Sequence, residues 1–506
     1  MLFLDDFKSL TLIFCGASVP LVDACPRWNR AAKLYGPKRK TNSMTRPLVY
    51  NAFLHLTPNH HSHGYWRTPE GRVQYGYKDL QPYIDVVKTL ERGRVDALFI
   101  ADVVGVYDLD FGDGATTIRA GSQFPENDPV TIVSALGHAT EHLGIAVTSN
   151  IIQDHPFSFA RRLSSLDHFT NGRVAWNIVT SYLSNGFRNY GYDEIVGHDD
   201  RYEWAQEYVD VTYKLWEHSW EDGAVLHNHE TGEFFDPAKI HTIDHVGKRY
   251  KVQGPHIVEP SPQRTPVLFQ AGNSPAGRTF AVTNAEVTFL PSYNPASAVR
   301  DIAVLDEQAR AIGRDPSSLK KIVMLSTIIG STEEEAKRKR EYFRENIDFE
   351  ALQAFWSGGS GIDLSSIDPD TPLSELAGRA QLGNHVQSNF RAAADSLEDP
   401  SKVSWRDYLV DKSLLPGRFA GTPEQIADHV QEWAASGIDG FNVVPITTLG
   451  WWDEWVDHVV PVLQDRGLAQ REYAPGTLRE KLFGRGDRLG DDHRARSLRL
   501  GSHQPA

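Results

Sequence analysis

Apolar and polar residues recur along this chain in two regular patterns, beginning at Pro47. Short apolar runs typical of buried strands alternate with longer stretches in which apolar residues return every three or four positions, as in amphipathic helices. The helical stretches include residues 80–91, 129–140, 157–167, 201–217 and 423–435. Eight runs have the strand pattern: residues 48–54, 95–102, 143–150, 173–181, 266–272, 285–291, 321–330 and 439–446. Eight alternating strand and helix units predict an α/β fold, a (β/α)8 TIM barrel whose active site lies at the carboxyl ends of the strands.

The uneven spacing of these units indicates a domain organisation. Residues 46–472 are expected to form the barrel, with insertions near residues 220–265 and 357–421 that are rich in Gly, Pro, Asp and Ser. Long insertions in a compact domain commonly serve as functional loops or lids. Residues 1–45 precede the periodic pattern and are expected to be a disordered extension, and residues 473–506 are expected to be a C-terminal tail.

Composition excludes several classes of protein. The 506 residues are 40% apolar and include 12 tryptophans, but no apolar run approaches the roughly 18 residues of a membrane span. The formal charge of −14 argues against a nucleic-acid partner, because no basic stripe offsets it. Both cysteines, Cys15 and Cys25, precede the predicted barrel, which therefore has no thiol for a disulfide, a metal site or a nucleophile. We expect a cytoplasmic protein with no nucleic-acid or membrane partner.

Two predicted helix starts have features of an anion site. Residues 267–278 run from an apolar strand through Ala-Gly-Asn-Ser-Pro into a helix, with Ser274 as the N-cap and Gly272 open to close approach. The free amides of a helix N-terminus suit a phosphate, although Ser274 fits an ordinary cap as well. At the second start, His198 and Tyr202 are four residues apart and project to one side. Taken singly, they also fit a loop histidine and a core aromatic residue.

Polar residues end two predicted strands at the rim where a barrel carries its catalytic groups. Asp102 comes directly after four apolar residues, and Ser149 and Asn150 end the third strand. Asp102 fits a helix or turn cap equally well. These positions are candidates for ligand binding.

Histidines gather in the loop after the first predicted strand, "TPNHHSHGYW", and His155 follows the third strand. His61 and His63, separated by one residue, suggest a metal site of the kind that barrel hydrolases use. That site needs further histidines at the middle strands and an aspartate at the last one. The fourth, fifth and eighth strands end in "NIVTS", "FQAG" and "FNVVPI", which lack them. A metal-dependent hydrolase is therefore the second hypothesis.

Six longer stretches together resemble one known family: the two-component flavin monooxygenases of the bacterial-luciferase superfamily, in the branch of nitrilotriacetate, dibenzothiophene-sulfone and long-chain alkane monooxygenases. The stretches are "DALFIADVVGVYD", "NDPV", "HPFSFARRLSSLDHFTNGRVAWNIVTS", "HDDRYEWAQEYVDVTYKLWEHSWED", "GPHIVEPSPQRTPVLFQAGNSPAGR" and "SGIDGFN". The resemblance extends from Pro47 to Arg494, and the alkane subgroup is the most similar.

The resemblance implies a barrel that binds reduced FMN at the carboxyl ends of its strands. Carried over position by position, it places Asp102 and Ser149 at the isoalloxazine and ribityl part of FMN. It places His198, Tyr202 and Ser274 at the phosphate. The phosphate assignment agrees with the cap-and-amide argument.

The implied activity is the oxygenation of a small organic substrate with reduced FMN and O2, without a metal. Four residues are candidates for the reacting side of the flavin: His155, Tyr107, Gln123 and His60. Each is expected to donate a hydrogen bond or a proton to the reacting groups, or to support a residue that does.

No Gly-x-Gly-x-x-Gly follows a predicted strand, so no built-in nicotinamide domain is expected. Reduced FMN would then come from a separate NAD(P)H:flavin reductase, and family barrels of this kind often form homo-oligomers. The sequence departs from the alkane-type pattern at Thr57 and Phe355, where that subgroup can carry cysteine and histidine. The substrate therefore stays open. A flavin- or deazaflavin-binding barrel without turnover is the third hypothesis.

Overall fold

The computed structural model describes residues 47–292, 294–377, 394, 399–413 and 418–498. These residues belong to two compact units. The larger comprises Pro47–Ser365 and Val410–Ala506, and the smaller contains the described part of Ser366–Leu409. The predicted extension of residues 1–45 lies outside the described residues.

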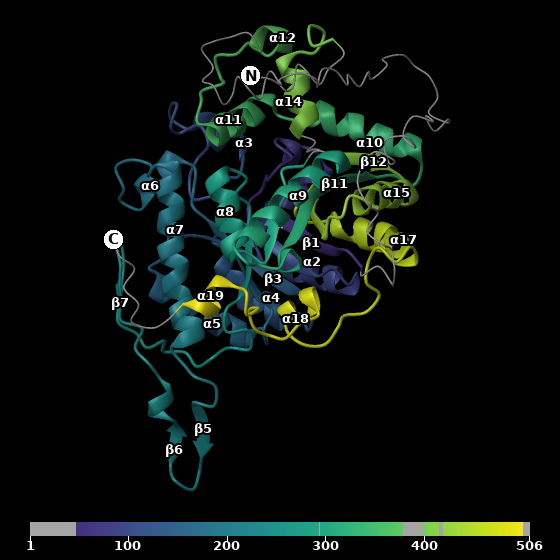
Figure 1. The fold of residues 1–506 in the computed structure, drawn as a ribbon. Helices are drawn as coiled ribbons and strands as arrows, with labels where there is room; N and C mark the ends of the chain where they lie inside the picture. The colour runs from purple at the N-terminus through teal and green to yellow at the C-terminus, as the bar shows by residue number, and fades with distance from the viewer. Residues whose placement is uncertain (1–46, 293, 378–393, 395–398, 414–417, 499–506) are drawn as a thin grey trace, which may run out of the picture. The chain divides into compact units, whose positions relative to one another are not determined.

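Eight parallel strands close into a barrel in the larger unit (Figure 1). Around the barrel they are β1 (Val49–His55), β2 (Ala97–Ala101), β3 (Gly144–Asn150), β4 (Val174–Val179), β9 (Val267–Gln270), β10 (Val287–Phe289), β11 (Lys320–Ile329) and β13 (Gly440–Val444). The ring closes because β1 pairs with β13, β13 with β11, and β11 with β10. The (β/α)8 fold is confirmed, and every barrel strand overlaps a predicted one.

Alternating side chains explain why these runs form a barrel. Phe53, Phe99, Phe269 and Phe289 point inward, and the ring centroids of Phe99 and Phe289 are 5.2 Å apart. The residues between them, such as Leu98, pack outward under the helices. Two-sided burial of this kind accounts for the near-continuous apolar runs in the sequence.

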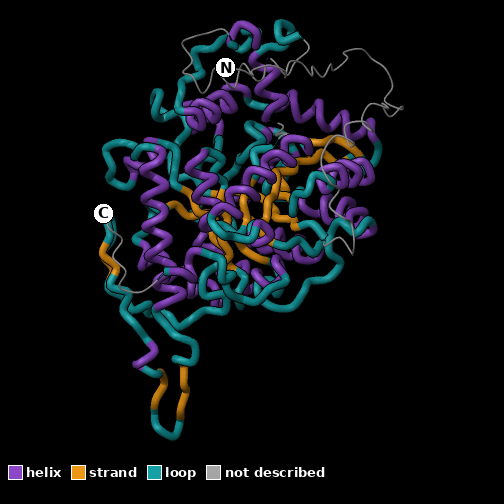
Figure 2. The backbone as a smooth tube through the Cα atoms, viewed as in Figure 1, coloured by secondary structure: helices purple, strands orange, loops and turns teal. Residues whose placement is uncertain are grey.

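Helices of the larger unit lie around the strands (Figure 2). They are α2 (Leu80–Arg92), α3 (Ala115–Ala120), α4 (Val133–His138), α5 (Pro156–Phe169), α6 (Ser184–Asn189), α7 (His198–Tyr213), α8 (Pro275–Asn284), α9 (Pro295–Ala311), α10 (Glu333–Asn346), α11 (Phe349–Ser360), α15 (Pro423–Ala434), α16 (Trp452–Glu454), α17 (Val460–Asp465), α18 (Leu478–Phe483) and α19 (Arg494–Ser497). The helix α12 (Leu373–Leu376) belongs to the smaller unit, and α14 (Trp405–Ser413) begins in it. No helix in the described part of the chain is long and apolar enough to cross a membrane.

The predicted insertion near residues 220–265 contains two small antiparallel hairpins. One pairs β5 (Val225–Asn228) with β6 (Glu233–Phe235) and extends away from the barrel (Figure 1). The other pairs β7 (His245–Val246) with β8 (Lys251–Val252). A further strand, β12 (Arg418–Gly421), pairs with the second half of β11. The sequence pattern predicted none of these strands, because each is short and lacks an apolar run.

The described part of the predicted C-terminal tail packs against the amino-terminal end of the barrel. Leu478 and Leu482 of α18 join the apolar cluster inside the barrel. Arg479, also buried, forms an ion pair with Glu286 at 2.7 Å. This segment closes one end of the barrel and leaves the carboxyl end for ligands.

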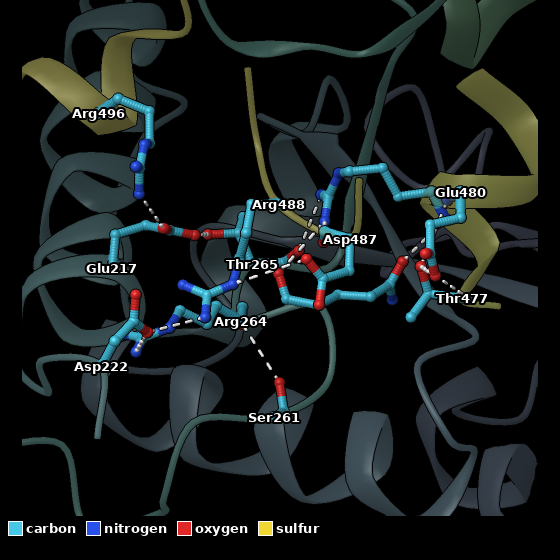
Figure 3. A network of polar contacts seen from close by, with 12 residues as sticks. Glu217, Asp222, Ser261, Arg264, Thr265, Thr477, Glu480, Asp487, Arg488 and Arg496 are labelled. Atoms are coloured by element: carbon cyan, nitrogen blue, oxygen red, sulfur yellow. Dashed lines mark hydrogen bonds and ion pairs between the residues drawn. The ribbon is translucent and has the colours of Figure 1, made fainter. Parts of the chain in front are cut away.

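A polar network ties the same C-terminal segment to the insertion (Figure 3). Asp222 forms ion pairs with Arg264 at 2.8 Å and with Arg488 at 2.9 Å. Glu217 accepts a hydrogen bond from Thr265 Oγ1 at 2.6 Å and lies 3.5 Å from Arg496. The segment is thus held by polar as well as apolar contacts.

Candidate functional site

A cavity of about 330 Å³ opens at the carboxyl ends of β2, β3, β4 and β9. Loop residues after these strands and the first turn of α7 form its wall. The lining residues are Asp102, Val103, Val104, Asn150, Ile178, Val179, Thr180, Ser181, Tyr182, Leu183, His198, Arg201, Tyr202, Gln270, Ala271, Gly272 and Phe280. Its position is the one that TIM barrels use for ligands, and its size suits a small molecule.

The helices α7 and α8 begin close together at this cavity. Ser274 is the N-cap of α8, and its Oγ accepts a hydrogen bond from the Gly277 amide at 3.0 Å. The Tyr202 hydroxyl of α7 hydrogen-bonds with the side chains of Ser274 and Gln270. A Cβ at Gly272 would overlap the Tyr202 hydroxyl and the Gln270 amide, so only glycine allows this approach. Hydroxyls and helix amides therefore meet at one end of the cavity.

Positive charge is available at the same end. Arg201 lines the cavity, donates from Nη1 to the Val196 carbonyl at 2.7 Å, and has a buried Nε with no hydrogen-bond partner. The ring centroids of His198 and Tyr202 are 5.3 Å apart, and His198 Nδ1 lies 2.8 Å from Asp199 Oδ1. Sequence reasoning missed Arg201, although it stands between the two residues chosen there. A cation beside two helix N-termini favours an anionic ligand.

Asp102, directly after β2, also lines the cavity and accepts a hydrogen bond from Gln153 Nε2 at 2.9 Å. Burial, reinforced by the nearby carboxyl of Glu126, raises the pKa of Asp102 to about 7. Ser149 is not among the lining residues. Its hydroxyl donates to Gln153 Oε1 at 3.4 Å, and the neighbouring Asn150 lines the cavity instead.

Three predicted reacting-side residues come together in a second, buried cluster. Tyr107 Oη donates to Gln123 Oε1 at 2.5 Å, and Gln123 Nε2 donates to the His60 carbonyl at 2.9 Å. Tyr107 Oη is also 2.7 Å from Tyr182 Oη. Because Tyr182 lines the cavity, it joins this cluster to the cavity by one hydrogen bond. We call Tyr107, Gln123, His60 and Tyr182 the tyrosine cluster.

Sequence reasoning did not select Tyr182, although this residue directly follows the fourth predicted strand, where ligand-binding residues of a barrel are expected. Although 47% of the residue is exposed, burial of its hydroxyl raises the pKa of Tyr182 to about 12. Burial also raises the pKa of Tyr107 well above its usual value. Both hydroxyls therefore stay protonated and can donate hydrogen bonds at neutral pH.

Imidazole rings pack beside the tyrosine cluster. The ring centroids of His60 and His61 are 4.9 Å apart, and His63 lies 4.9 Å from the Phe355 ring of α11. His63 Nδ1 is 2.5 Å from Ser122 Oγ. Within the described residues no group of three or more His, Cys, Asp or Glu side chains is arranged to hold a metal ion. The geometry thus gives the hydrolase hypothesis no support.

His155 has a different setting from the other three reacting-side candidates. It is exposed, and its Nδ1 accepts a hydrogen bond from the Phe157 amide at 3.3 Å as the N-cap of α5. Its ring packs edge-on against Tyr250 at 5.5 Å. Partial burial lowers the pKa of His155, so the ring is neutral at neutral pH. The structure does not bring it into the tyrosine cluster or among the lining residues of the cavity.

Comparisons with known proteins agree with this geometry. The luciferase-like monooxygenase family matches residues 52–440. The dimethyl-sulfide monooxygenase of Hyphomicrobium sulfonivorans is 41% identical over 463 residues, covering 90% of this chain and 94% of the relative. The long-chain alkane monooxygenase of Geobacillus thermodenitrificans is 39% identical over 458 residues, covering 90% and 99%.

A solved structure is similar over the same length. A riboflavin lyase determined with modified FMN and riboflavin is 32% identical, with a TM-score of 0.80, covering 89% of this chain and 99% of that one. The family resemblance inferred from the sequence is confirmed. The chain belongs to the luciferase-like monooxygenase family and is a flavin-dependent monooxygenase.

Proposed function

We propose that the protein uses reduced FMN and O2 to oxygenate a small organic substrate, and that a separate NAD(P)H:flavin reductase supplies the reduced FMN. The observation that carries the proposal is the connection of two unlike sites. The cavity has an end suited to an anion. Tyr182 lines this cavity and connects it by one hydrogen bond to the buried tyrosine cluster. A flavin in the first would present its ring to a substrate in the second.

The phosphate of FMN would lie at the start of α7 and α8. Arg201 supplies charge there, and the His198 ring and the hydroxyls of Tyr202 and Ser274 supply hydrogen bonds. The unpartnered Arg201 Nε and the tight Gly272 turn both fit a phosphate group. Four donors and two helix ends would hold a dianion strongly.

Asp102 and Ser149 are proposed for the isoalloxazine and ribityl part. Asp102 would contact the flavin directly, since it lines the cavity. Ser149 would act through Gln153, which bonds both side chains. When bound, reduced FMN supplies the reaction with O2, and the protein's part is orientation and the exclusion of water.

The tyrosine cluster is proposed to face the substrate. Tyr107 and Tyr182 would orient the reacting groups with their hydroxyl oxygens, and Gln123 would fix the Tyr107 hydroxyl by accepting a hydrogen bond from it. His60 would position Gln123 through its carbonyl. His155, which follows β3 and has an exposed ring, is proposed to accept or supply a proton during the reaction.

Reconstitution with and without a reductase tests this function. The protein is mixed with NADH, FMN and O2, together with small sulfides, alkanes and amine-carboxylates as candidate substrates. Oxygenated product should form only when a flavin reductase is also present, because no nicotinamide-binding motif was found in the chain. Product at the same rate without any reductase would contradict the proposal.

A further inference from the structure

A buried hydrogen-bonded pair, Glu126 and His55, lies beside the tyrosine cluster, with the ring centroids of His55 and His60 5.8 Å apart. Glu126 Oε1 is 2.5 Å from His55 Nδ1, and the two side chains are 6% and 3% exposed. His55 is the last residue of β1, and its register partner on β2 is Ala101. The next residue is Asp102, so this half-buried carboxyl of the cavity wall stands at the strand end beside the buried His55–Glu126 pair. The electrostatic effect of Glu126 on Asp102 reflects this proximity.

The surroundings of Asp102 differ from those of Glu126. The Asn150 amide donates to Gln153 Oε1 at 2.5 Å, which turns Gln153 Nε2 toward Asp102 Oδ2. Asp102 thus has a neutral amide as its hydrogen-bond donor. Arg201 and His198 line the same cavity, but among the described ion pairs none joins either of them to Asp102.

Two carboxyls in one buried region cannot both be ionised without a large cost. His55 bonds Glu126 directly and favours its ionised form, opposing the burial that raises the pKa of Glu126. Among the described residues no ion pair joins Asp102 to a cation. The Gln153 hydrogen bond and the charge of His55 act to lower its pKa, but burial, followed by the carboxyl of Glu126, outweighs them and raises it to about 7. The remaining charged or titratable groups that act on these two carboxyls are Asp128, Tyr190, Tyr83, Tyr107 and Tyr182.

Building on the proposed function, we propose that Glu126, held by His55, is a positioning residue that keeps Asp102 protonated. Asp102 then faces the cavity as a neutral hydrogen-bond donor to an oxygen or nitrogen of the flavin ring. An ionised Asp102 would instead repel the electron-rich reduced flavin. Glu126 acts through Asp102 and does not itself line the cavity.

Infrared spectroscopy of the protein without FMN tests the protonation directly, because a protonated carboxyl absorbs apart from a carboxylate. The wild-type protein should show a carboxyl that titrates near pH 7 and that disappears in Asp102→Asn. In Glu126→Gln the same titration should move down by about one pH unit or more, since a nearby negative charge is lost. Asp128→Asn is the matched control, because it removes a weaker neighbouring charge and Asn still caps the following turn.

An unchanged midpoint in Glu126→Gln would overturn the inference. If Glu126→Gln fails to fold, the wild-type titration still tests the inference. The absence of a carboxyl signal from Asp102 near neutral pH would equally overturn the inference. These outcomes do not depend on whether FMN binds.

Binding of oxidised FMN gives a second readout. Wild-type affinity should fall as pH rises through the Asp102 titration, whereas Asp102→Asn should show no such fall, because its amide donates at every pH. Glu126→Gln should show the fall at lower pH. A wild-type affinity that does not change across this range would contradict the donor role, whereas failure to bind FMN at any pH would count against the proposed function.

Discussion

Single hydroxyl groups carry much of the proposed phosphate site, and they can be removed one at a time. Tyr202→Phe and Ser274→Ala each delete one donor to a charged group, which is worth about 1.5–3 kcal/mol. FMN affinity should fall about 10- to 150-fold in each variant, while circular dichroism shows an unchanged fold. Fluorescence titration of FMN measures the loss.

A matched variant separates binding from helix capping. Thr422 caps α15 in the same way that Ser274 caps α8, but it does not line the cavity. Thr422→Ala should lower stability by about 1 kcal/mol and leave FMN affinity unchanged. Equal FMN affinities in wild type, Tyr202→Phe and Ser274→Ala would remove these hydroxyls from the phosphate site.

His155 has both a capping contact at the start of α5 and a proposed chemical role, and substitution by asparagine separates the two. Asn preserves an N-cap side chain for α5, so His155→Asn should keep the wild-type melting temperature. Loss of the imidazole should lower the yield of product per NADH oxidised, with FMN affinity unchanged. A wild-type yield in this variant would leave His155 as a capping residue only.

Asp102 should also make stability depend on pH. Its pKa is raised from 3.8 to about 7 in the folded protein, so between these values the folded state binds a proton that the unfolded state has lost. This contribution to the unfolding free energy is full below the unfolded pKa and is lost as pH rises through the folded pKa. Relative to wild type, Asp102→Asn should therefore gain stability of about 2–3 kcal/mol between about pH 5 and about pH 8.

Urea unfolding at the two pH values measures this gain. Asp85→Asn, a change on the outer face of α2, should show none. The same difference from wild type at both pH values in Asp102→Asn would show that the native carboxyl is already ionised at the lower one.

The position of a candidate residue in the fold can be predicted from sequence where the residue has its own local signal. Ser274 precedes a proline at a helix start, and Asp102 ends an apolar run. Glu126 has no such signal, because its proposed role depends on His55, 71 positions away. Tyr182 directly follows a predicted strand, but its hydrogen bond with Tyr107, 75 positions away, has no local signal. For the proposed flavin contact of Ser149, strand alternation near a rim does not reveal which of two neighbours, Ser149 or Asn150, faces the cavity.

Secondary-structure elements were predictable wherever burial covers both of their faces or one long stripe. The barrel strands β1 to β4 are apolar runs between turn signals, and α2 has a clear stripe. The hairpin of β5 and β6 exposes Leu226 and Phe234, so no burial pattern marks it. The role of α18 was hidden because its helix is short and its partners are at the far end of the sequence.

The buried arginine of α18 should matter more than its neighbours on the surface. Arg479→Met leaves Glu286 charged and buried without its partner, which should cost about 3–5 kcal/mol in unfolding free energy. Arg485→Met breaks an exposed pair with Asp315 and should cost no more than about 1 kcal/mol. Thermal and urea unfolding compare the two. Equal losses would show that α18 does not close the barrel through this pair.

For the whole molecule, the central claim is that the cavity binds FMN by its phosphate between α7 and α8. Calorimetric titration of the wild-type protein with FMN and with riboflavin, which lacks only the phosphate, tests it most directly. FMN should bind at least about 100-fold more tightly, because several charge-assisted hydrogen bonds depend on the phosphate. Equal affinity for FMN and riboflavin, or binding of neither, would contradict the claim.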